Sequence, residues 1–409
     1  MTGIWLNRIS RGLSRPPGEL ARRLAMEGRA FLERFQGPPA GPLDEAGLWE
    51  RLGARPSPWF TRPVDTSLYE THCPGDGERI LAAADAAIEG RIDLLGSGPV
   101  QLSRPLPWPE DFKTGLAWPH KFHRDIDVND FSRPSDVKLP WEFSRLQWAL
   151  PAGQAYLLKG EARYAEFVRA LLEEWIKANP YGRGVNWTSA MEASMRIFVW
   201  VWFFHVFHQA PAWQDESFRN DFLISLYRHG VYVSRYLEDF GLNGNHCVAD
   251  GAGLVVAGLF FGEGGKPASW VAQGWRVLER EMFRQTHPDG VDFEASTFYH
   301  RLVAELFLLP MAYRRVLGME VPGAMDERLA LMGEFADSYM AGQAAAPLWG
   351  DGDDGRVLPF GGQAVGDHNY LGPLIRNYLG DGAPVSPELF WLSGPPAASG
   401  IEGKPTAPS

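Results

Sequence analysis

The chain has 409 residues, of which 45% are hydrophobic and 13% aromatic, so it can bury a large core in one or two domains. Its net charge of -11 argues against nonspecific binding to nucleic acid or to an anionic membrane. Its only cysteines, Cys73 and Cys247, cannot build a disulfide framework or a cysteine-based zinc site.

The first 36 residues are predicted to be helical, and residues 19–35 form an Arg-rich amphipathic pattern. They lack the sustained apolar core of a signal peptide. We therefore expect a cytoplasmic protein, or a periplasmic or secreted one if this N-terminus is not the native one. Glycines and prolines in residues 37–42 end the helical pattern.

Prolines and aromatic residues are frequent from residue 43 to residue 140. This composition predicts a short helix at 77–88, then a few short strands and a long covering loop at 89–140. Residues 1–140 are therefore interpreted as an N-terminal helical and loop-rich region that packs on the rest of the chain.

Long helical patterns with short connections follow. Helices are predicted at 142–159, 161–178, 189–208, 214–239, 246–261, 268–286, 294–317 and 325–342. Gly160 separates the first pair, and the third helix begins with Ser189 and Glu192 in the spacing of a capping box.

The apolar run from Ile197 to Phe207 is shorter than the roughly 18–20 residues that cross a bilayer, so it predicts a buried helix. Such apolar helices suit an inner layer, and helices with one charged face suit an outer layer. Two layers of antiparallel helix pairs predict a mainly α protein, an α/α toroid over residues 141–392 with a cleft at its loop ends.

The end of the chain changes character again. Residues 348–357 are predicted to be a loop, and short elements continue to Trp391. Residues 393–409 are rich in proline, glycine and serine, which indicates a linker or tail. A linker in this position suggests that a further domain once followed it.

Two polar segments stand out within the helical region. Asn245 and His246 lie where a glycine- and asparagine-rich loop meets an apolar helix, so a rigid helix can hold them in a cleft. Glu294 is predicted to open a later helix that carries Tyr299. The 54 residues between Asn245 and Tyr299 correspond to about two helices with their loops, as expected for neighbouring helix pairs whose ends meet.

Five segments carry a family resemblance. They are residues 141–147, 184–196, 244–246 with 257–261, 294–301 and 350–356. Over roughly residues 85–375 the chain resembles the heparinase II/III-like polysaccharide lyases, including related alginate lyases. The resemblance implies an N-terminal α/α toroid, a following β-sandwich domain and an active site between them. Because such a sandwich would begin about where this chain stops, we expect an incomplete toroid without the β-sandwich.

The same resemblance implies β-elimination on a uronic-acid-containing polysaccharide. The C5 proton of a uronate becomes accessible only when the neighbouring carboxylate is neutralised, a role for which Asn245 and His246 match the family positions. Tyr299 matches the tyrosine that takes the C5 proton and protonates the leaving O4. The structural alternatives are a helix-capping Asn245, a satisfied buried His246 and a buried Tyr299 with a bonded hydroxyl.

Further residues are predicted to bind substrate. They are Asn186, Trp187, Glu192, Arg196, Glu294, His300 and Arg301. In this interpretation Asn186 and Arg196 bind a carboxylate and Trp187 stacks on a sugar ring. The alternative for Glu192 is a helical pair with Arg196 at i,i+4, or closure of the capping box. The family draws a further His or Tyr from the β-sandwich, for which His368 is the nearest remaining candidate.

Two groups of residues imitate metal sites. The first comprises Asp351, Asp353 and Asp354, which fail the EF-hand pattern because the twelfth position is Gly362, so a structural loop is expected. The second comprises His120, His123, Asp125 and Asp127, which we interpret as surface or cleft-rim residues. No metal and no cofactor is therefore expected.

The expected partner is an anionic polysaccharide or oligosaccharide, with no nucleic acid and no membrane, and the sequence does not indicate an oligomeric state. Two other functional classes stay open at this point. One is a glycoside hydrolase on a toroid scaffold that uses Glu294 and Asp250. The other is a non-catalytic carbohydrate-binding protein derived from a lyase.

Overall fold

Helices dominate the computed structural model, which describes residues 17–44, 47–96, 98–241, 243–262 and 264–395. The helices before the predicted toroid are α2 (Pro17–Glu33), α3 (Leu48–Gly53), α4 (Thr66–His72) and α5 (Asp76–Ile88). Those that follow are α6 (Lys138–Arg145), α7 (Leu150–Lys159), α8 (Ala162–Ala178), α9 (Ala190–Phe207), α10 (Glu216–Tyr236), α11 (Asn245–Phe261), α12 (Gly265–Gln285), α13 (Thr297–Val316), α14 (Gly323–Met340), α15 (Leu371–Leu379) and α16 (Pro387–Ser393).

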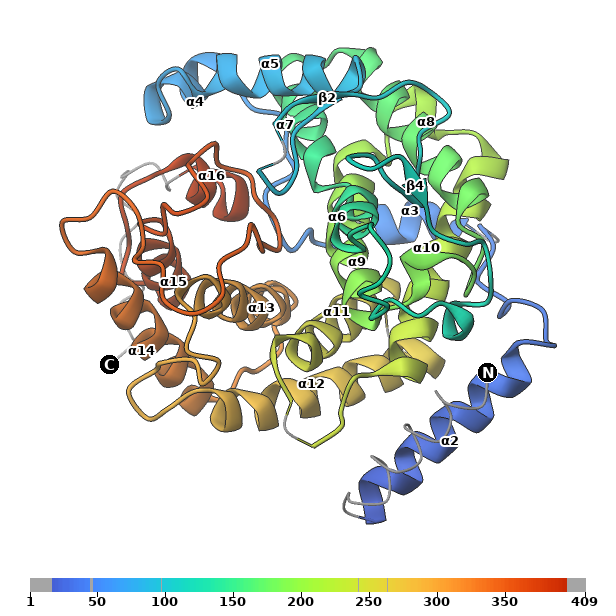
Figure 1. Ribbon diagram of the computed structural model, residues 1–409. Helices are drawn as coiled ribbons and strands as arrows, with labels where there is room; N and C mark the ends of the chain where they lie inside the picture. The colour runs from blue at the N-terminus through green and yellow to red at the C-terminus, as the bar shows by residue number, and fades with distance from the viewer. Residues whose placement is uncertain (1–16, 45–46, 97, 242, 263, 396–409) are drawn as a thin grey trace, which may run out of the picture.

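The helices form a ring with two layers (Figure 1). Helices α9, α11 and α13 lie nearest the centre, while α8, α10, α12 and α14 lie outside them. Every residue of α9 is buried, and so are fourteen of the seventeen residues of α11. The predicted α/α toroid and its apolar inner layer are therefore confirmed.

Helix α9 meets the length and hydropathy expected of a membrane span, with a mean hydropathy of 1.2 over 18 residues. All of that window is buried inside the protein. Its apolar surface packs against the neighbouring helices α7, α10 and α11 rather than facing outward, as expected for a core helix.

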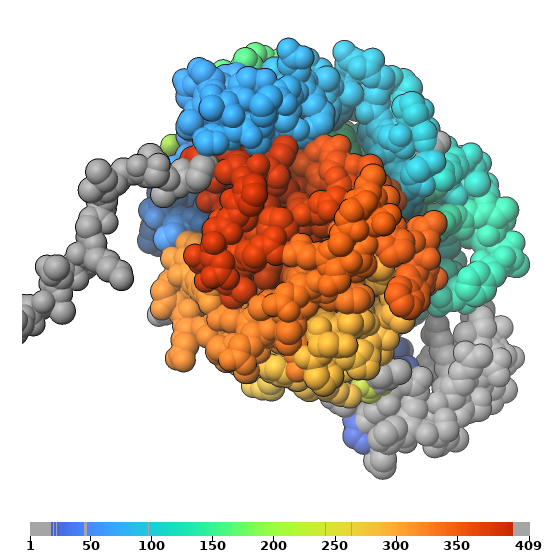
Figure 2. All heavy atoms as spheres, turned by 90° about the vertical axis from the view of Figure 1, so that its left-hand side faces the viewer, coloured from blue at the N-terminus to red at the C-terminus, as the bar shows by residue number. Residues whose placement is uncertain are grey.

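Helix α16, the last described helix, meets α4 and closes the ring. Trp391 of α16 donates a hydrogen bond from Nε1 to the hydroxyl of Tyr69 in α4, 2.8 Å away. Phe390 packs edge-on against the same tyrosine, with 4.8 Å between ring centroids. Figure 2 shows the red C-terminal segments lying directly against the blue α4–α5 segment. One continuous core joins these elements to α9 and α11.

The strands are short, as predicted. β1 (Arg91–Ile92) pairs antiparallel with β2 (Val100–Gln101), and β3 (Glu110–Asp111) pairs antiparallel with β4 (Leu116–Ala117). Among the described residues these two hairpins are the only sheets, so these residues form no β-sandwich. The predicted boundary at residue 140 stays a prediction.

The predicted helix at 142–159 is wrong in one respect, because the chain breaks within it. Leu146 has a φ of 63°, which ends α6 in the left-handed region. A turn of 3-10 helix, η3 (Gln147–Ala149), follows before α7 begins with Pro151 in its first turn. The break directs the end of α6 toward the N-terminus of α9, where Arg145 meets Glu192.

Two helix starts also differ from the prediction. Glu294 does not open a helix, because α13 begins only at Thr297, after Ala295 with a φ of 54° and the N-cap Ser296. Ser189 does precede α9, but it forms no capping box with Glu192. The backbone N–H of Ala190 is instead capped by the carboxylate of Glu238 at 3.3 Å.

Candidate active site

A small pocket lies where the N-terminal ends of α9, α11 and α13 meet α6 and the loop before α15. Its lining comprises Lys138, Trp141, Glu142, Arg145, Met191, Glu192, Asn245, His246, Tyr299, Leu302, Asp353 and Gly355. The N-terminus of a helix carries about half a positive charge, so three such ends at one place favour an anionic group. The pocket brings together Asn245, His246 and Tyr299, the three residues predicted to be catalytic.

Asn245 is the first residue of α11, and Glu294 fixes its orientation. The backbone N–H of Asn245 donates to Oε1 of Glu294 at 2.7 Å, and its side-chain Nδ2 donates to Oε2 at 2.8 Å. A side chain on the preceding residue, Gly244, would place its Cβ 2.1 Å from the same carboxylate. Glycine at position 244 therefore lets the carboxylate cap the helix and hold the amide at the pocket.

His246 lies beside Asn245 and is paired with Glu238. Its Nδ1 is 3.0 Å from Oε2 of Glu238, and its side chain remains 47% exposed. Burial by itself would lower the pKa of His246, but the hydrogen bond and charge of Glu238 outweigh this effect and raise that pKa above its usual value. The raised pKa favours the protonated imidazole, which can neutralise a substrate carboxylate, and the half-exposed side chain is not a core residue.

Glu238 is the residue that sequence reasoning missed. It follows α10 and connects the N-termini of α9 and α11. Its Oε1 accepts hydrogen bonds from Ser189 Oγ and from the backbone N–H of Ala190, both at 3.3 Å, before and at the start of α9. Its Oε2 contacts His246 of α11. Its own backbone N–H donates to buried Asp250 at 2.8 Å. Eight residues separate Glu238 from His246 across an irregular loop, so no periodic pattern signals the pair.

Tyr299 occupies the first turn of α13. Ser296, the N-cap, accepts from the backbone N–H of Tyr299 at 3.1 Å, which sets where the helix begins. The ring is half-buried against the pocket, and its hydroxyl makes no hydrogen bond to any described residue. Burial, with the charges of Asp353 and Asp351, raises the pKa of Tyr299 to about 12.

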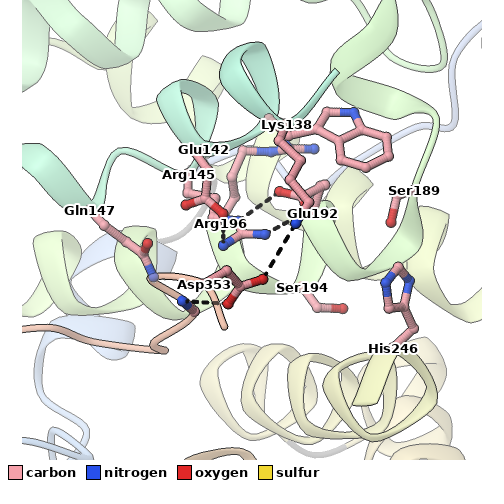
Figure 3. A network of polar contacts seen from close by, with 12 residues as sticks. Lys138, Glu142, Arg145, Gln147, Ser189, Glu192, Ser194, Arg196, His246 and Asp353 are labelled. Atoms are coloured by element: carbon pink, nitrogen blue, oxygen red, sulfur yellow. Dashed lines mark hydrogen bonds and ion pairs between the residues drawn. The ribbon is translucent and has the colours of Figure 1, made fainter. Parts of the chain in front are cut away.

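A buried charge network forms the wall opposite His246 (Figure 3). Arg145 donates from Nε and Nη2 to the two oxygens of Glu192 at 2.8 and 2.7 Å, and it also pairs with Glu142. Lys138 reaches Asp353 across the pocket mouth at 3.5 Å. Two alternatives for Glu192, an ion pair with Arg196 and the closure of a capping box, are therefore wrong. Arg145 instead holds Glu192 in the pocket wall.

The two carboxyl groups beside Arg145 have opposite protonation tendencies. Burial raises the pKa of Glu142 to about 7, despite the neighbouring arginine. Burial also acts on Glu192, but there the charge and hydrogen bonds of Arg145 prevail and lower its pKa. Glu142 is thus the carboxyl group of this wall that can gain a proton near neutral pH.

Three predicted substrate contacts lie in the core instead. Arg196 is fully buried on α9, where Nε meets His229 at 2.9 Å and Nη2 donates to the carbonyl of Asn186 at 2.8 Å. Asn186 donates to the Trp108 carbonyl at 3.0 Å, and Trp187 is also buried. Because these side chains have no surface toward the pocket, their interpretation as carboxylate and sugar contacts is not supported.

Two more predicted contacts point away from Tyr299. Successive residues of a helix point about 100° apart, so His300 and Arg301 face the interior when Tyr299 faces the pocket. His300 is buried with Nε2 3.0 Å from the Met332 carbonyl, and burial lowers its pKa to about 4. Arg301 donates to the carbonyls of Val365 and Gly355, so it fixes the loop rather than a substrate.

The structure does not bring together His120, His123, Asp125 and Asp127 as a group that could hold a metal ion. His123 is buried against Tyr232 at 2.8 Å, so it is not a rim residue, and Asp125 pairs with Arg34. His368 is buried beside Tyr339 at 2.9 Å, away from the pocket.

One further group could hold an ion by geometry. It comprises Asp239, Cys247 and Glu281. Arg280 already pairs with Asp239 at 3.1 Å and with Glu281 at 2.6 Å. An arginine in this position supplies the positive charge that an ion would bring.

Comparisons with known proteins point to one family. A sequence model described as Heparinase II/III N-terminus matches residues 110–358. A heparin-sulfate lyase from Bacteroides stercoris is 28% identical over 193 residues, which are 42% of this chain and 28% of that protein. One from Pedobacter heparinus is 28% identical over 232 residues, 54% of this chain and 33% of that protein. The matches thus cover about a third of the length of these curated relatives.

Solved structures share the fold. A structure of heparinase III superposes with a TM-score of 0.53 at 19% identity, covering 73% of this chain and 46% of that chain. A heparan sulfate lyase from Pedobacter heparinus gives a TM-score of 0.50 at 21% identity, covering 74% of this chain and 44% of that chain. At these identities the likeness extends to the toroid fold and no further.

Proposed function

The chain belongs to the heparinase II/III N-terminus family, and from this premise we propose that it is a polysaccharide lyase that cleaves a uronic-acid-containing anionic polysaccharide by β-elimination. The observation that carries the proposal is the pocket in which three groups come together: His246 with a raised pKa, an oriented Asn245, and a Tyr299 hydroxyl without a hydrogen bond to any described residue. The heparin-sulfate lyases among the relatives make glycosaminoglycans the first polymers to test.

The proposed reaction begins with neutralisation of the uronate carboxylate. The imidazolium of His246 and the amide of Asn245 hold this carboxylate at the positive ends of α9, α11 and α13. As negative charge develops on the carboxylate, these donors stabilise it. The C5–H bond then breaks, the electron pair forms the C4=C5 double bond, and the C4–O bond breaks. No water is consumed, and the leaving O4 receives one proton.

Tyr299 handles the protons in this scheme. With a pKa raised to about 12 it is protonated at rest, so it can donate directly to the leaving O4. To accept the C5 proton it must first be deprotonated, which the nearby carboxylates of Asp351 and Asp353 oppose. Lys138, which pairs with Asp353 at 3.5 Å, and a protonated His246 favour loss of the tyrosine proton to solvent. The tyrosinate then takes the C5 proton, and the tyrosine so formed passes it to the leaving O4, so one proton moves from C5 to O4 overall.

The two carboxylates assigned to the hydrolase alternative, Glu294 and Asp250, are both engaged in other contacts. Asp250 is fully buried and accepts a backbone hydrogen bond from Glu238. Glu294 is engaged with both nitrogens of Asn245. No observation specifically favours a non-catalytic carbohydrate-binding protein, whereas Asn245, His246 and Tyr299 together line the pocket.

The proposal is tested by incubating the protein with heparan sulfate, heparin, hyaluronan and alginate. Formation of the C4=C5 double bond is followed by ultraviolet absorbance. We expect absorbance to rise on at least one polymer. Tyr299→Phe should reduce the rate by about 100-fold or more, as expected for loss of a general acid–base group. Its thermal unfolding should match that of the parent protein, because the hydroxyl has no hydrogen-bond partner among the described residues.

The matched control is Tyr227→Phe, which removes a partly buried hydroxyl outside this pocket. It should retain the parental rate. Absence of any absorbance change on all four polymers, with a folded protein, would contradict the proposal.

A further inference from the structure

A second, larger pocket lies at the other end of the same inner helices. It has a volume of about 810 Å³ and is lined by residues of the segment 53–63 and by the last turns of α9 and α13. Glu192 and His205 of α9 line the two different pockets, and three and a half helical turns separate them by about 20 Å. We call this second site the rear pocket.

The charge of the rear pocket contrasts with that of the whole chain. The net charge of the chain is -11, yet the lining contains Arg55, Arg62 and Arg315 and neither aspartate nor glutamate. Arg315 pairs with Asp326. Arg55 and Arg62 make no ion pair with any described residue. Two guanidinium groups without a carboxylate partner among the described residues therefore line this cavity.

Helix dipoles do not cancel this positive charge. The C-terminal ends of α9 and α13 each bring about half a negative charge to the rear pocket, about one charge in total. Arg55 and Arg62 bring two positive charges. Arg55 also packs against Gly262, where an added Cβ would lie 2.1 Å from its Nη1, so it complements the end of α11 as well. Arg62 is exposed and has no such structural contact, which makes it the more informative position.

Buried polar atoms in the lining also lack partners. Nε2 of His205 and Nε1 of Trp59 make no hydrogen bond to any described residue, although these residues are only 5% and 4% exposed. Burial, together with His208 and Arg55, lowers the pKa of His205 to about 3, so its imidazole is neutral at physiological pH. An unsatisfied buried polar group costs about 1–3 kcal/mol, which a ligand with polar groups can recover.

Aromatic surface accompanies the basic groups. Phe60, Tyr156 and Tyr378 are partly buried residues that also line the rear pocket. Aromatic rings provide flat apolar surface beside the arginines. A ligand that matches the arginines and the aromatic rings has negative groups attached to rings with one apolar face. An anionic sugar has both.

From this combination we propose that the rear pocket binds an anionic oligosaccharide, separately from the candidate active site. Carboxylate or sulfate groups on the sugar contact Arg55 and Arg62, polar hydroxyl groups satisfy His205 and Trp59, and sugar faces pack on the aromatic rings. The choice of a saccharide over another anion rests on the proposed function. The site would hold a second segment of the polymer or a released product.

The test uses isothermal titration calorimetry on the full chain carrying Tyr299→Phe and His246→Ala, which disable the candidate active site. The probes are a hyaluronan hexasaccharide, a heparin hexasaccharide, neutral maltohexaose and inorganic sulfate. We expect one equivalent of at least one anionic hexasaccharide to bind. Adding Arg62→Ala should weaken this binding about tenfold, the effect of losing one charge-assisted hydrogen bond of about 1.4 kcal/mol.

The matched control is Arg276→Ala, which removes an exposed arginine of α12 outside the rear pocket and should change the affinity less than twofold. Three results would overturn the proposal: no binding of either anionic hexasaccharide, equal affinity for maltohexaose, or no effect of Arg62→Ala. Equal affinity for inorganic sulfate would assign the pocket to free anions instead. Failure of the lyase proposal shows separately, as absent absorbance from the parent protein in the polymer assay.

Discussion

At the residue scale, the charge on His246 depends on one carboxylate that belongs to none of the sequence motifs. Glu238 binds Nδ1 of His246 and also caps α9 through Ala190, so one side chain fixes both the imidazole and the helix end beside it. Removing the charge of Glu238 while keeping its shape therefore separates the electrostatic role from the structural one.

Replacement Glu238→Gln should lower the pKa of His246 toward or below its usual value. Because Glu238 raises this pKa in the folded protein, the parent imidazolium persists to higher pH than in the variant. The alkaline limb of the kcat/KM profile should therefore shift to lower pH. Nuclear magnetic resonance titration of the His246 ring measures the pKa directly.

The same pair contributes to stability with a defined sign. The pKa of His246 is higher in the folded protein than its value of about 6.5 in the unfolded chain. The pair with Glu238 therefore contributes its full stabilisation below about pH 6.5. This stabilisation is lost as the pH rises through the pKa of His246 in the folded protein. The control Glu334→Gln changes an exposed carboxylate of α14 and should leave the profile unchanged. An unshifted His246 titration in Glu238→Gln would refute the electrostatic role.

Residue types and order predicted Asn245, His246 and Tyr299, and the structure places all three in one pocket. His300 and Arg301, which follow Tyr299, were wrongly predicted to reach the pocket. A sequence motif groups consecutive residues, whereas consecutive side chains of a helix point in different directions. Arg196 was misplaced for another reason. The sequence around it is apolar on all sides, which already indicated a wholly buried helix.

At the element scale, the N-terminus of α11 depends on Glu294, which lies outside α13. Glu294→Ala removes the acceptor of the Asn245 backbone N–H and of its side-chain amide. We expect the free energy of unfolding to fall by about 1–2 kcal/mol, the value of a helix cap with a favourable charge. Urea unfolding measures this change, and steady-state kinetics should show a lower kcat because Asn245 loses its orientation.

The comparison for this variant is Glu327→Ala, an exposed position of α14 without a hydrogen-bond partner among the described residues. It should change the free energy of unfolding by less than about 0.5 kcal/mol. If Glu294→Ala were equally neutral, the helix-capping role would be wrong.

The loop that carries Asp353 is fixed by a buried ionic cluster. Arg356 donates to Glu305 and Glu388, each at 2.7 Å, and all three side chains are nearly inaccessible to solvent. Arg356→Met leaves two buried carboxylates uncompensated and should destabilise the protein by about 3–5 kcal/mol in urea unfolding. Arg376→Met breaks an exposed ion pair with Asp337 and should cost about 1 kcal/mol or less. Equal effects of the two variants would contradict this account of the loop.

Helix periodicity predicted the elements well but not their exact ends. The break at Leu146 was not predictable, because a leucine with positive φ leaves no signature of composition. The start of α13 was predicted too early, because an acidic residue such as Glu294 is typical of the first turn of a helix. The N-cap is Ser296, whose side chain accepts a hydrogen bond from the backbone N–H of Tyr299.

At the scale of the whole molecule, the ring is closed by residues more than 300 positions apart. Trp391 packs between Tyr69 and Phe60, so the last described helix supports α4 and the segment that precedes it. The layered pattern of helices predicted a toroid, but no local pattern could show which ends meet, because this contact joins distant segments through packing alone.

Trp391→Ala should lower the free energy of unfolding by about 3–5 kcal/mol, since it removes a fully buried tryptophan from the closure. Trp349→Ala removes a tryptophan that is 64% exposed and should have an effect within about 0.5 kcal/mol. Urea unfolding of both variants measures the difference. A small effect at Trp391 would mean that the ring holds together without this contact.

The central claim is that the pocket formed by three helix N-termini performs elimination and not hydrolysis. Mass spectrometry of products formed in water labelled with heavy oxygen tests it most directly, because elimination adds no water whereas hydrolysis adds one labelled oxygen per cleavage. We predict unlabelled products that are lighter than the hydrolysis products by one water. Products that carry the label, or no cleavage of any uronate polymer, would contradict the account.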